Sequence, residues 1–303
     1  MKKVLLIVIG FGIFGVLSAQ QLPLYTQYMF NRMLINPGVT GSEENLPIQL
    51  AVRQQWVGFE DAPSTQTLSG HYCLQNYNMG VGGILFVDRF GPEQKIGIQL
   101  NYSYILKLGD DLKLAFGLSL QGFQYRLDYT KLNVIDETDP NIYTTQESKF
   151  VPESDFGVYL YHNDYFAGIS ANQMIGLPIK IGGEEIHMTK LVRHFNLLGG
   201  YKFDLTPEFA LEPSVLVKTS FKAPSQLDIN LKAIYQKNYW IGTSYRTSGD
   251  IIAMLGLRFK EFDFGFAVDF ATSDIAAYQN GSYEIVLTYR IPMKPRGSGR
   301  SMY

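Results

Sequence analysis

Hydrophobic and polar residues alternate one by one along most of the chain. Over residues 96–106 every second residue is large and apolar, and the residues between them are mostly small or polar. The same pattern returns over 112–121, 262–271 and 283–291. Because successive side chains of a β-strand point to opposite faces, this period of two predicts strands with one apolar and one hydrophilic face.

Turn-forming residues divide the alternating pattern into segments of similar length. Most of the segments hold ten or more residues, long enough for a tilted strand that crosses a bilayer. Strands of soluble proteins are more often about five or six residues long. The number of segments is even, about fourteen, as expected of a bacterial outer-membrane barrel. The predicted strands cover 48–59, 65–74, 78–88, 95–108, 112–127, 154–162, 164–172, 191–204, 208–220, 226–236, 239–248, 250–260, 262–272 and 281–291.

The connections between these segments alternate between short and long. Two of the links, 128–153 and 173–190, are far longer than tight turns such as 109–111 and 163–164. Outer-membrane barrels have short periplasmic turns and longer external loops. If both chain ends lie in the periplasm, the two long links fall on the external side.

The predicted inward face is hydrophilic, whereas the predicted outward face is apolar on nearly every strand. A single segment of this kind also fits a half-buried strand of a soluble protein, but the set does not, since a soluble barrel has an apolar core. We therefore predict an all-β fold, a transmembrane antiparallel barrel in the outer membrane. The charged and polar inward positions are Arg53, Gln55, His71, Lys202, Glu212, Lys218, Asp228, Lys232, Arg246, Arg258, Asp263, Asp269, Glu284 and Arg290.

The first residues have the pattern of a secretory signal peptide. Lys2 and Lys3 precede an apolar run over 4–17, and Ser18-Ala19 offers a site for cleavage. The alternative, a buried N-terminal helix, is disfavoured because the run is short and positively flanked. The predicted organisation is a signal peptide at 1–19, an N-terminal periplasmic or plug segment at 20–47, the barrel at 48–291 and a flexible basic periplasmic tail at 292–303.

Composition narrows the class further. The net charge is −2 and the single cysteine, Cys73, excludes an internal disulfide. Nothing in this balance suggests a nucleic-acid partner. The inward charges are of both signs, whereas an ion-selective pore usually carries a ring of one sign. We therefore expect a lumen closed by internal salt bridges and a plug, with little or no ion conductance.

Several short motifs lie at the start of the predicted mature chain. The first motif, which begins at Tyr25, could form a short helix. Asn36-Pro37 would end this helix, because a residue before proline is pushed out of the α region. The motif residues are Tyr25, Thr26, Gln27, Tyr28 and Asn31 in the first segment, Asn36 and Pro37 in the next, Arg53, Gln55 and Trp56 at the first strand, and Pro63, Thr65 and His71 at the second.

Taken together, these motifs resemble the PorP/SprF family of type IX secretion membrane proteins from Bacteroidetes. The resemblance implies an outer-membrane barrel that binds or escorts secreted surface proteins, such as gliding adhesins, and contacts periplasmic secretion components. The motif residues would then either dock partners or pack and hydrogen-bond within the barrel, and we favour the packing role for most of them. Arg53 is expected to pair with an inward acid, and Trp56 to face lipid as an interfacial anchor.

Catalysis and cofactor binding find little support. Glu184, Glu185 and His187 lie together in one loop, but a solvated acidic loop explains them better than a zinc or calcium site. Ser69 and His71 share a strand face without a third group to orient them. We predict no enzyme activity, metal or cofactor. The alternative function is a passive outer-membrane transporter of hydrophobic small molecules, which would need an apolar pocket in the lumen.

Overall fold

The computed structural model describes residues 25–131, 146–181 and 187–293. The predicted signal peptide, and the tail beyond residue 293, lie outside these residues. In the described part of the chain, no helix is long and apolar enough to cross a membrane.

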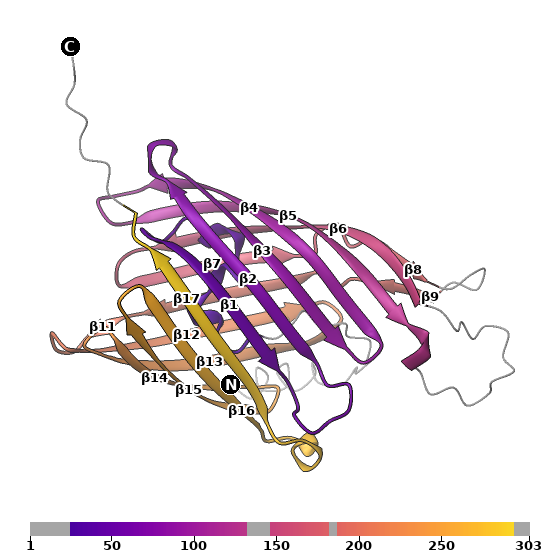
Figure 1. Cartoon of the computed structure of the whole chain (residues 1–303). Helices are drawn as coiled ribbons and strands as arrows, with labels where there is room; N and C mark the ends of the chain where they lie inside the picture. Colours follow the sequence, from indigo (N-terminus) through magenta and orange to yellow (C-terminus); the bar gives the residue numbers. More distant parts are fainter. Residues whose placement is uncertain (1–24, 132–145, 182–186, 294–303) are drawn as a thin grey trace, which may run out of the picture.

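The strands form a closed antiparallel barrel. Its first and last strands pair along their whole length, and Figure 1 shows this indigo and yellow pair side by side. The sheet order contains fifteen strands, of which the two-residue β11 only extends the pairing on β12, which leaves fourteen in the barrel wall. The wall strands are β1 (Leu46–Gln54), β2 (Ser64–Leu74), β3 (Met79–Phe90), β4 (Glu93–Lys107), β5 (Lys113–Asp128), β6 (Gln146–Tyr161), β7 (Tyr165–Asn172), β10 (His194–Tyr201), β12 (Phe209–Ser220), β13 (Ala223–Tyr235), β14 (Tyr239–Arg246), β15 (Asp250–Phe259), β16 (Phe262–Ala271) and β17 (Ser282–Ile291), and β11 is Phe203–Asp204. The predicted fold class is confirmed.

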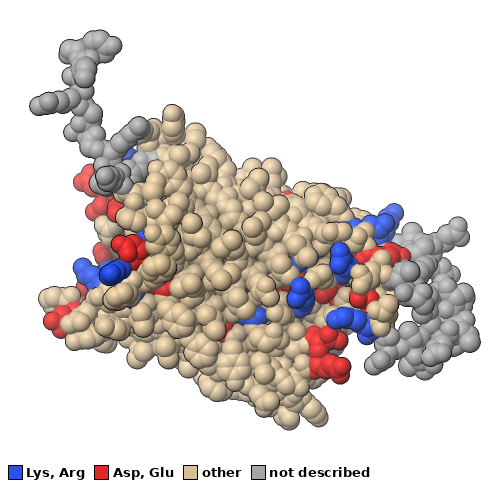
Figure 2. All heavy atoms as spheres, in the orientation of Figure 1, with Lys and Arg blue, Asp and Glu red and all other residues tan. Residues whose placement is uncertain are grey.

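The faces of the strands follow the predicted alternation. Leu100 and Leu120 face each other across β4 and β5 and are 60% and 64% exposed, while Ser103 and Ser119 of the same strands are buried. In Figure 2 the visible middle of the molecule carries few charged side chains, and these gather toward its two ends. An apolar band between charged ends is the surface that a bilayer requires.

The two ends of the barrel differ in their connections. At one end, which we call the turn end, the strands are joined by short links such as 108–112, 162–164 and 236–238. At the opposite end, the loop end, lie most of the longer links, including 55–63 and 272–281. The second long link contains an unpredicted hairpin, β8 (Pro178–Ile181) and β9 (His187–Lys190), and β6 begins earlier than predicted, at Gln146. The strands around the first long link therefore extend beyond their predicted bounds.

The N-terminal segment lies inside the barrel. It forms three short 3-10 helices, η1 (Tyr28–Phe30), η2 (Arg32–Leu34) and η3 (Pro37–Val39), instead of the single short helix expected. Asn36-Pro37 begins η3 and does not end a helix. Asn36 is extended, as a residue before proline should be, and its side chain accepts a hydrogen bond from the Gly38 amide. Three more 3-10 turns lie in connections: η4 (Gln75–Tyr77), η5 (Tyr129–Lys131) and η6 (Asp274–Tyr278).

The lumen also contains apolar clusters that the strand pattern did not predict. The largest joins the N-terminal segment to the wall through Met33, Ile84, Tyr159 and Leu216. The predicted hydrophilic inward face therefore describes only part of the interior. These side chains occupy inward positions among hydrophilic ones, so that the interior is part packed core and part polar network.

Candidate functional site

The candidate site is the plugged lumen. We use "plug" for residues 25–44, which pass through the lumen and lead into β1 at the turn end. Figure 1 shows these indigo turns within the ring of strands. Three groups of contacts hold the plug, and each uses residues that the barrel presents from different strands.

The first group binds the start of the plug to the last strand. The two carboxylate oxygens of Glu284 accept hydrogen bonds from the backbone amides of Thr26 (2.7 Å) and Gln27 (2.9 Å). The Gln27 side chain donates to the Glu284 carbonyl at 3.1 Å. The Thr26 hydroxyl donates to both oxygens of Asp269, at 3.0 and 2.9 Å. A buried carboxylate needs hydrogen-bond donors, and here the backbone amides of the plug provide them. The wall therefore depends on the plug for these hydrogen bonds.

Arg53 lies between the same two acids. Its Nη2 is 2.6 Å from Asp269 and its Nη1 is 3.6 Å from Glu284, and the Nη1 also donates to the Thr26 hydroxyl. All three charged side chains are at least 97% buried. The prediction that Arg53 pairs with an inward acid is confirmed.

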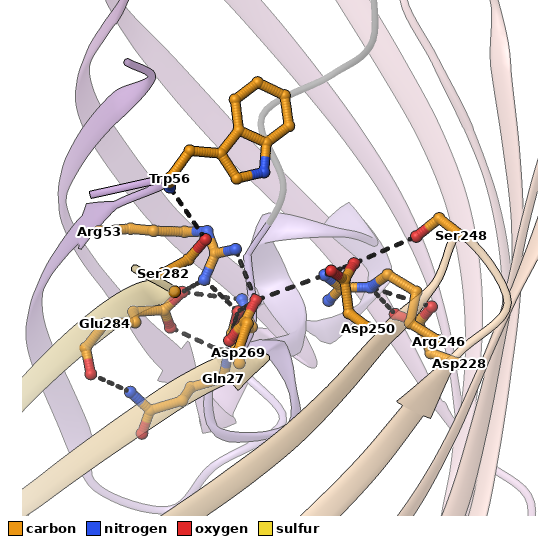
Figure 3. A network of polar contacts seen from close by, with 12 residues as sticks. Gln27, Arg53, Trp56, Asp228, Arg246, Ser248, Asp250, Asp269, Ser282 and Glu284 are labelled. Carbon is orange, nitrogen blue, oxygen red and sulfur yellow. Dashed lines mark hydrogen bonds and ion pairs between the residues drawn. The ribbon is translucent and has the colours of Figure 1, made fainter. Parts of the chain in front are cut away.

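A second arginine extends this network along the wall. Arg246 lies 3.3 Å from Asp228 and 3.6 Å from each of Asp250 and Asp269, so that Asp269 stands between two guanidinium groups. Figure 3 shows Asp269 bridging Arg53 and Arg246. The network thus sets two cations against four carboxylates. The backbone amides of the plug act as further hydrogen-bond donors to these carboxylates. This favours the position of the plug against the wall.

The second group seats η3 against glycines of the wall. Asn36 donates to the carbonyls of Val158 (3.0 Å) and Ile169 (3.1 Å) from its side-chain amide. A Cβ atom on Gly157 would collide with the Asn36 carboxamide, and one on Gly117 would collide with the backbone at Pro37 and Gly38. Backbone can approach a strand this closely only where the strand residue lacks a side chain.

The third group lies nearer the turn end. Arg32 of the plug is 2.8 Å from Glu212, and the same carboxylate is 2.9 Å from Lys232. The guanidinium carbon of Arg32 also lies 3.7 Å from the centre of the Phe166 ring. Phe30 packs against Trp240 at a ring distance of 4.1 Å. A carboxylate shared by two cations, with an aromatic ring on one of them, fixes the plug without an unpaired buried acid.

The two largest cavities in the described part of the chain lie on opposite sides of the plug. The turn-end cavity, of about 600 Å³, is lined by Arg32 and Glu43 of the plug and by Tyr165 and Lys202 of the wall. The loop-end cavity, of about 370 Å³, is lined by other plug residues, including Tyr25. The two cavities share no lining residue, because the plug lies between them.

Part of the second long link folds back at the loop end. Glu153 accepts hydrogen bonds from the amides of Ile175 (3.1 Å) and Gly176 (2.8 Å), and Asp155 accepts from the amide of Gln173 (2.9 Å). Ile179 is buried against the inward residues of β5 and β6. Two wall carboxylates therefore hold the start of this link against the barrel.

Most of the motif residues are engaged within the chain. Tyr28 accepts a hydrogen bond from Asn230 at 2.6 Å, and Asn31 donates to Ser69 at 2.7 Å. His71 accepts from the Gly41 amide at 3.0 Å, so Ser69 and His71 each have a structural partner in the plug.

The remaining motif residues lie near the end of β1. Thr65 donates to Asp88 at 2.6 Å, and the Gln55 amide donates to the Pro63 carbonyl at 2.9 Å. β1 ends at Gln54 and Trp56 has a φ of 44°, outside the extended region, so the alternation of the strand does not determine which way Trp56 points. The Trp56 amide donates to Ser282 at 3.1 Å, as Figure 3 shows.

No metal-binding group occurs in the part of the chain that the structure describes. Glu184 and Glu185 lie outside that part, and the side chain of His187 is not described. Sequence reasoning missed the seating role of Gly117 and Gly157. In the sequence, both appear only as small residues at inward positions of neighbouring strands. This pattern does not distinguish a glycine that contacts a plug from any other residue facing the lumen.

The fold and the plugged lumen together define an outer-membrane barrel with an internal N-terminal plug. The chain belongs to the family described as type IX secretion system membrane protein PorP/SprF, whose profile matches residues 17–289. The family resemblance seen in the motifs is thereby confirmed. No curated protein matches the chain.

Solved structures with a similar fold include two toluene transporters and a FadL homologue. The toluene transporter TbuX of Ralstonia pickettii has a TM-score of 0.55 and 9% identity, with 86% of this chain and 93% of that chain covered. The toluene transporter TodX of Pseudomonas putida has a TM-score of 0.52 and 11% identity, with 87% and 94% covered. A FadL homologue of Pseudomonas aeruginosa has a TM-score of 0.50 and 10% identity, with 88% and 94% covered. At these identities the likeness concerns the fold alone.

Proposed function

We propose that this protein binds or escorts secreted surface proteins, such as gliding adhesins, at the outer membrane and contacts periplasmic components of the type IX secretion system. Membership of the family supports a role in this system. The observation that carries the rest of the proposal is the closed lumen. Since the plug crosses the lumen and bonds to its wall, binding surfaces for large partners lie at the two ends.

The burial of the motif residues supports the placement of partner contacts at the ends of the barrel. Tyr28, Asn36, Arg53 and His71 are buried and hydrogen-bonded within the chain. Buried side chains of this kind cannot also contact a separate protein without losing their partners. In our proposal they maintain the plugged barrel, and partner contacts belong to exposed residues elsewhere.

The ends of the barrel suggest which partner binds where. By the rule that outer-membrane barrels place short turns in the periplasm, the turn end faces the secretion machinery and the loop end faces the cell exterior. The loop end exposes Phe150 (73%) and Phe221 (91%). The turn end exposes Tyr201 and Phe203, whose rings are 4.5 Å apart. Exposed aromatic side chains are frequent anchors in protein interfaces.

The experiment is a pull-down of the full-length protein after mild detergent extraction, with a matched variant at each end. Phe150→Ser with Phe221→Ser should reduce recovery of secreted surface proteins and leave periplasmic components unchanged. Tyr201→Ser with Phe203→Ser should do the opposite. Recovery of neither class with the unaltered protein would contradict the proposal.

Deletion of the gene followed by a census of cell-surface proteins separates the proposal from its alternative. Loss of one adhesin indicates escort of a particular cargo, and loss of all type IX cargo indicates a core role in secretion. The alternative, passive transport of hydrophobic small molecules, has the apolar surface of the loop-end cavity in its favour. It predicts an unchanged set of surface proteins and a slower uptake of such molecules.

A further inference from the structure

The loop-end cavity has the size of a small-molecule site. Its volume of about 370 Å³ lies within the range of pockets that bind cofactors and other small ligands. The plug forms one boundary through Tyr25, Leu34 and Ile35. The plug separates this cavity from the turn-end cavity, so a ligand would be held there and not conducted across the barrel.

One side of the cavity is apolar. Ile84 and Phe86 of β3 and Phe123 of β5 line it, and the rings of Phe86 and Phe123 lie 6.2 Å apart. Leu34 and Ile35 of the plug extend this surface. Burial of an apolar group against such side chains is favourable in proportion to the area removed from water.

Another part of the wall supplies a cation that has no carboxylate in direct contact. Lys218 of β12 lines the cavity, and its neighbours in the sheet are the neutral residues Asn196 and Gln226. Among the described residues, no carboxylate lies within salt-bridge distance of the Lys218 ammonium. Asp228 and Glu284 attract it from farther away, and Arg246 and Arg53 repel it. The ammonium lies 5.8 Å from the centre of the Tyr28 ring. By contrast, Lys232 on the neighbouring strand is 2.9 Å from Glu212.

The acids of the cavity are already engaged by the protein. Asp155 accepts from the Gln173 amide at 2.9 Å and from Ser119 at 2.8 Å. Asp88 accepts from Thr65 at 2.6 Å, and Lys95 of β4 lies opposite it in the sheet. Two lysines line the cavity. Lys95 has the carboxylate residue Asp88 opposite it in the sheet, whereas Lys218 has neutral residues opposite it on both neighbouring strands, which makes Lys218 the better partner for an anionic ligand. A cation in a largely apolar pocket favours an anion over a neutral ligand.

We propose that the loop-end cavity binds a small amphipathic carboxylate. Its apolar body packs against Ile84, Phe86 and Phe123, and its carboxylate pairs with the Lys218 ammonium. This site goes beyond the secretion role and does not depend on it, since the cavity residues lie inside the lumen and the surfaces proposed for protein partners lie at the two ends of the barrel.

The test uses the full chain in lipid nanodiscs and isothermal titration with 4-phenylbutyrate, with 4-phenylbutan-1-ol as the neutral match. We expect saturable binding of the acid at one site. Lys218→Met should weaken it about tenfold or more, while Lys218→Arg should retain it. The alcohol should bind about tenfold more weakly than the acid and be insensitive to Lys218→Met. Lys202→Met, which removes a paired lysine that lines the turn-end cavity, should bind the acid like the unaltered protein.

Three results would overturn the proposal. The first is the absence of binding above that of empty nanodiscs. The second is equal affinity for the acid and the alcohol, because the ammonium would then play no part. The third is unchanged affinity in Lys218→Met, with circular dichroism showing that the variant keeps its β-structure.

Discussion

Arg53 of β1 reaches past β17 to place its Nη2 atom 2.6 Å from Asp269 of β16. This ion pair spans the seam where the first and last strands of the barrel meet, because β17 pairs with β1 on one side and with β16 on the other. Thr26 of the plug bonds to both members of the pair. Closure of the barrel and seating of the plug therefore depend on the same cluster of buried charges.

The first prediction concerns this cluster. Arg53→Met should lower the free energy of unfolding by about 3–5 kcal/mol, because it leaves Asp269 and Glu284 buried without their shared countercharge. Urea unfolding in detergent micelles, followed by circular dichroism, measures the change. Arg258→Met is the matched control, since its ion pair with Asp263 is 44% exposed on the arginine side and should contribute about 0–1 kcal/mol. Equal stability of the two variants would contradict the prediction.

The second prediction concerns the glycine seat of η3. Gly157→Ala should displace the plug while the wall remains intact, because the added methyl group would occupy the space of the Asn36 carboxamide. Limited proteolysis should then cleave within residues 25–44, which resist cleavage in the unaltered protein. Gly83→Ala is the control on a neighbouring part of the sheet, since its Cβ would meet nothing closer than 3.5 Å. Equal resistance of the two variants would mean that the seat tolerates a methyl group.

The wall of this barrel follows from its sequence, and the plug mostly does not. Because a strand repeats every two residues, the parity of Leu100 and Ser103 tells which faces lipid and which faces the lumen. Parity gives no information about partners across the lumen. Asp269 and Thr26 are distant in sequence and meet only because the barrel closes. The sequence therefore predicted that salt bridges close the lumen, but it did not predict which residues pair.

The alternation of apolar and polar residues also did not show where a strand ends. Trp56 continues the alternation of β1, yet the strand ends at Gln54 and the chain turns through a positive φ at Trp56. The Val57 amide there donates to the Gly281 carbonyl at 2.9 Å, a contact with a loop more than two hundred residues away in the sequence. Tertiary contacts of this kind override a short-range pattern, so the alternation of β1 does not extend to Trp56.

The third prediction concerns the outer face. Leu118→Arg should lower the free energy of unfolding by about 2–4 kcal/mol, because its side chain is half exposed on the apolar face of β5. Leu108→Arg, in a connection at the turn end, should cost about 0–1 kcal/mol since a charge there reaches the interface. Unfolding in lipid vesicles measures both. A similar loss at the two positions would argue against a bilayer around the apolar band.

The last prediction concerns conductance. The unaltered protein should show little or no current in a planar bilayer, because the plug separates the two cavities of the lumen. Deletion of residues 25–44 should open a steady channel, since the charged inward residues would then line a water-filled passage and no longer need plug partners. Gly157→Ala keeps every residue of the plug and should show intermittent openings, which guards against a deletion that fails to fold. Large steady channels in the unaltered protein, or silence in both variants, would show that the plug is not the barrier.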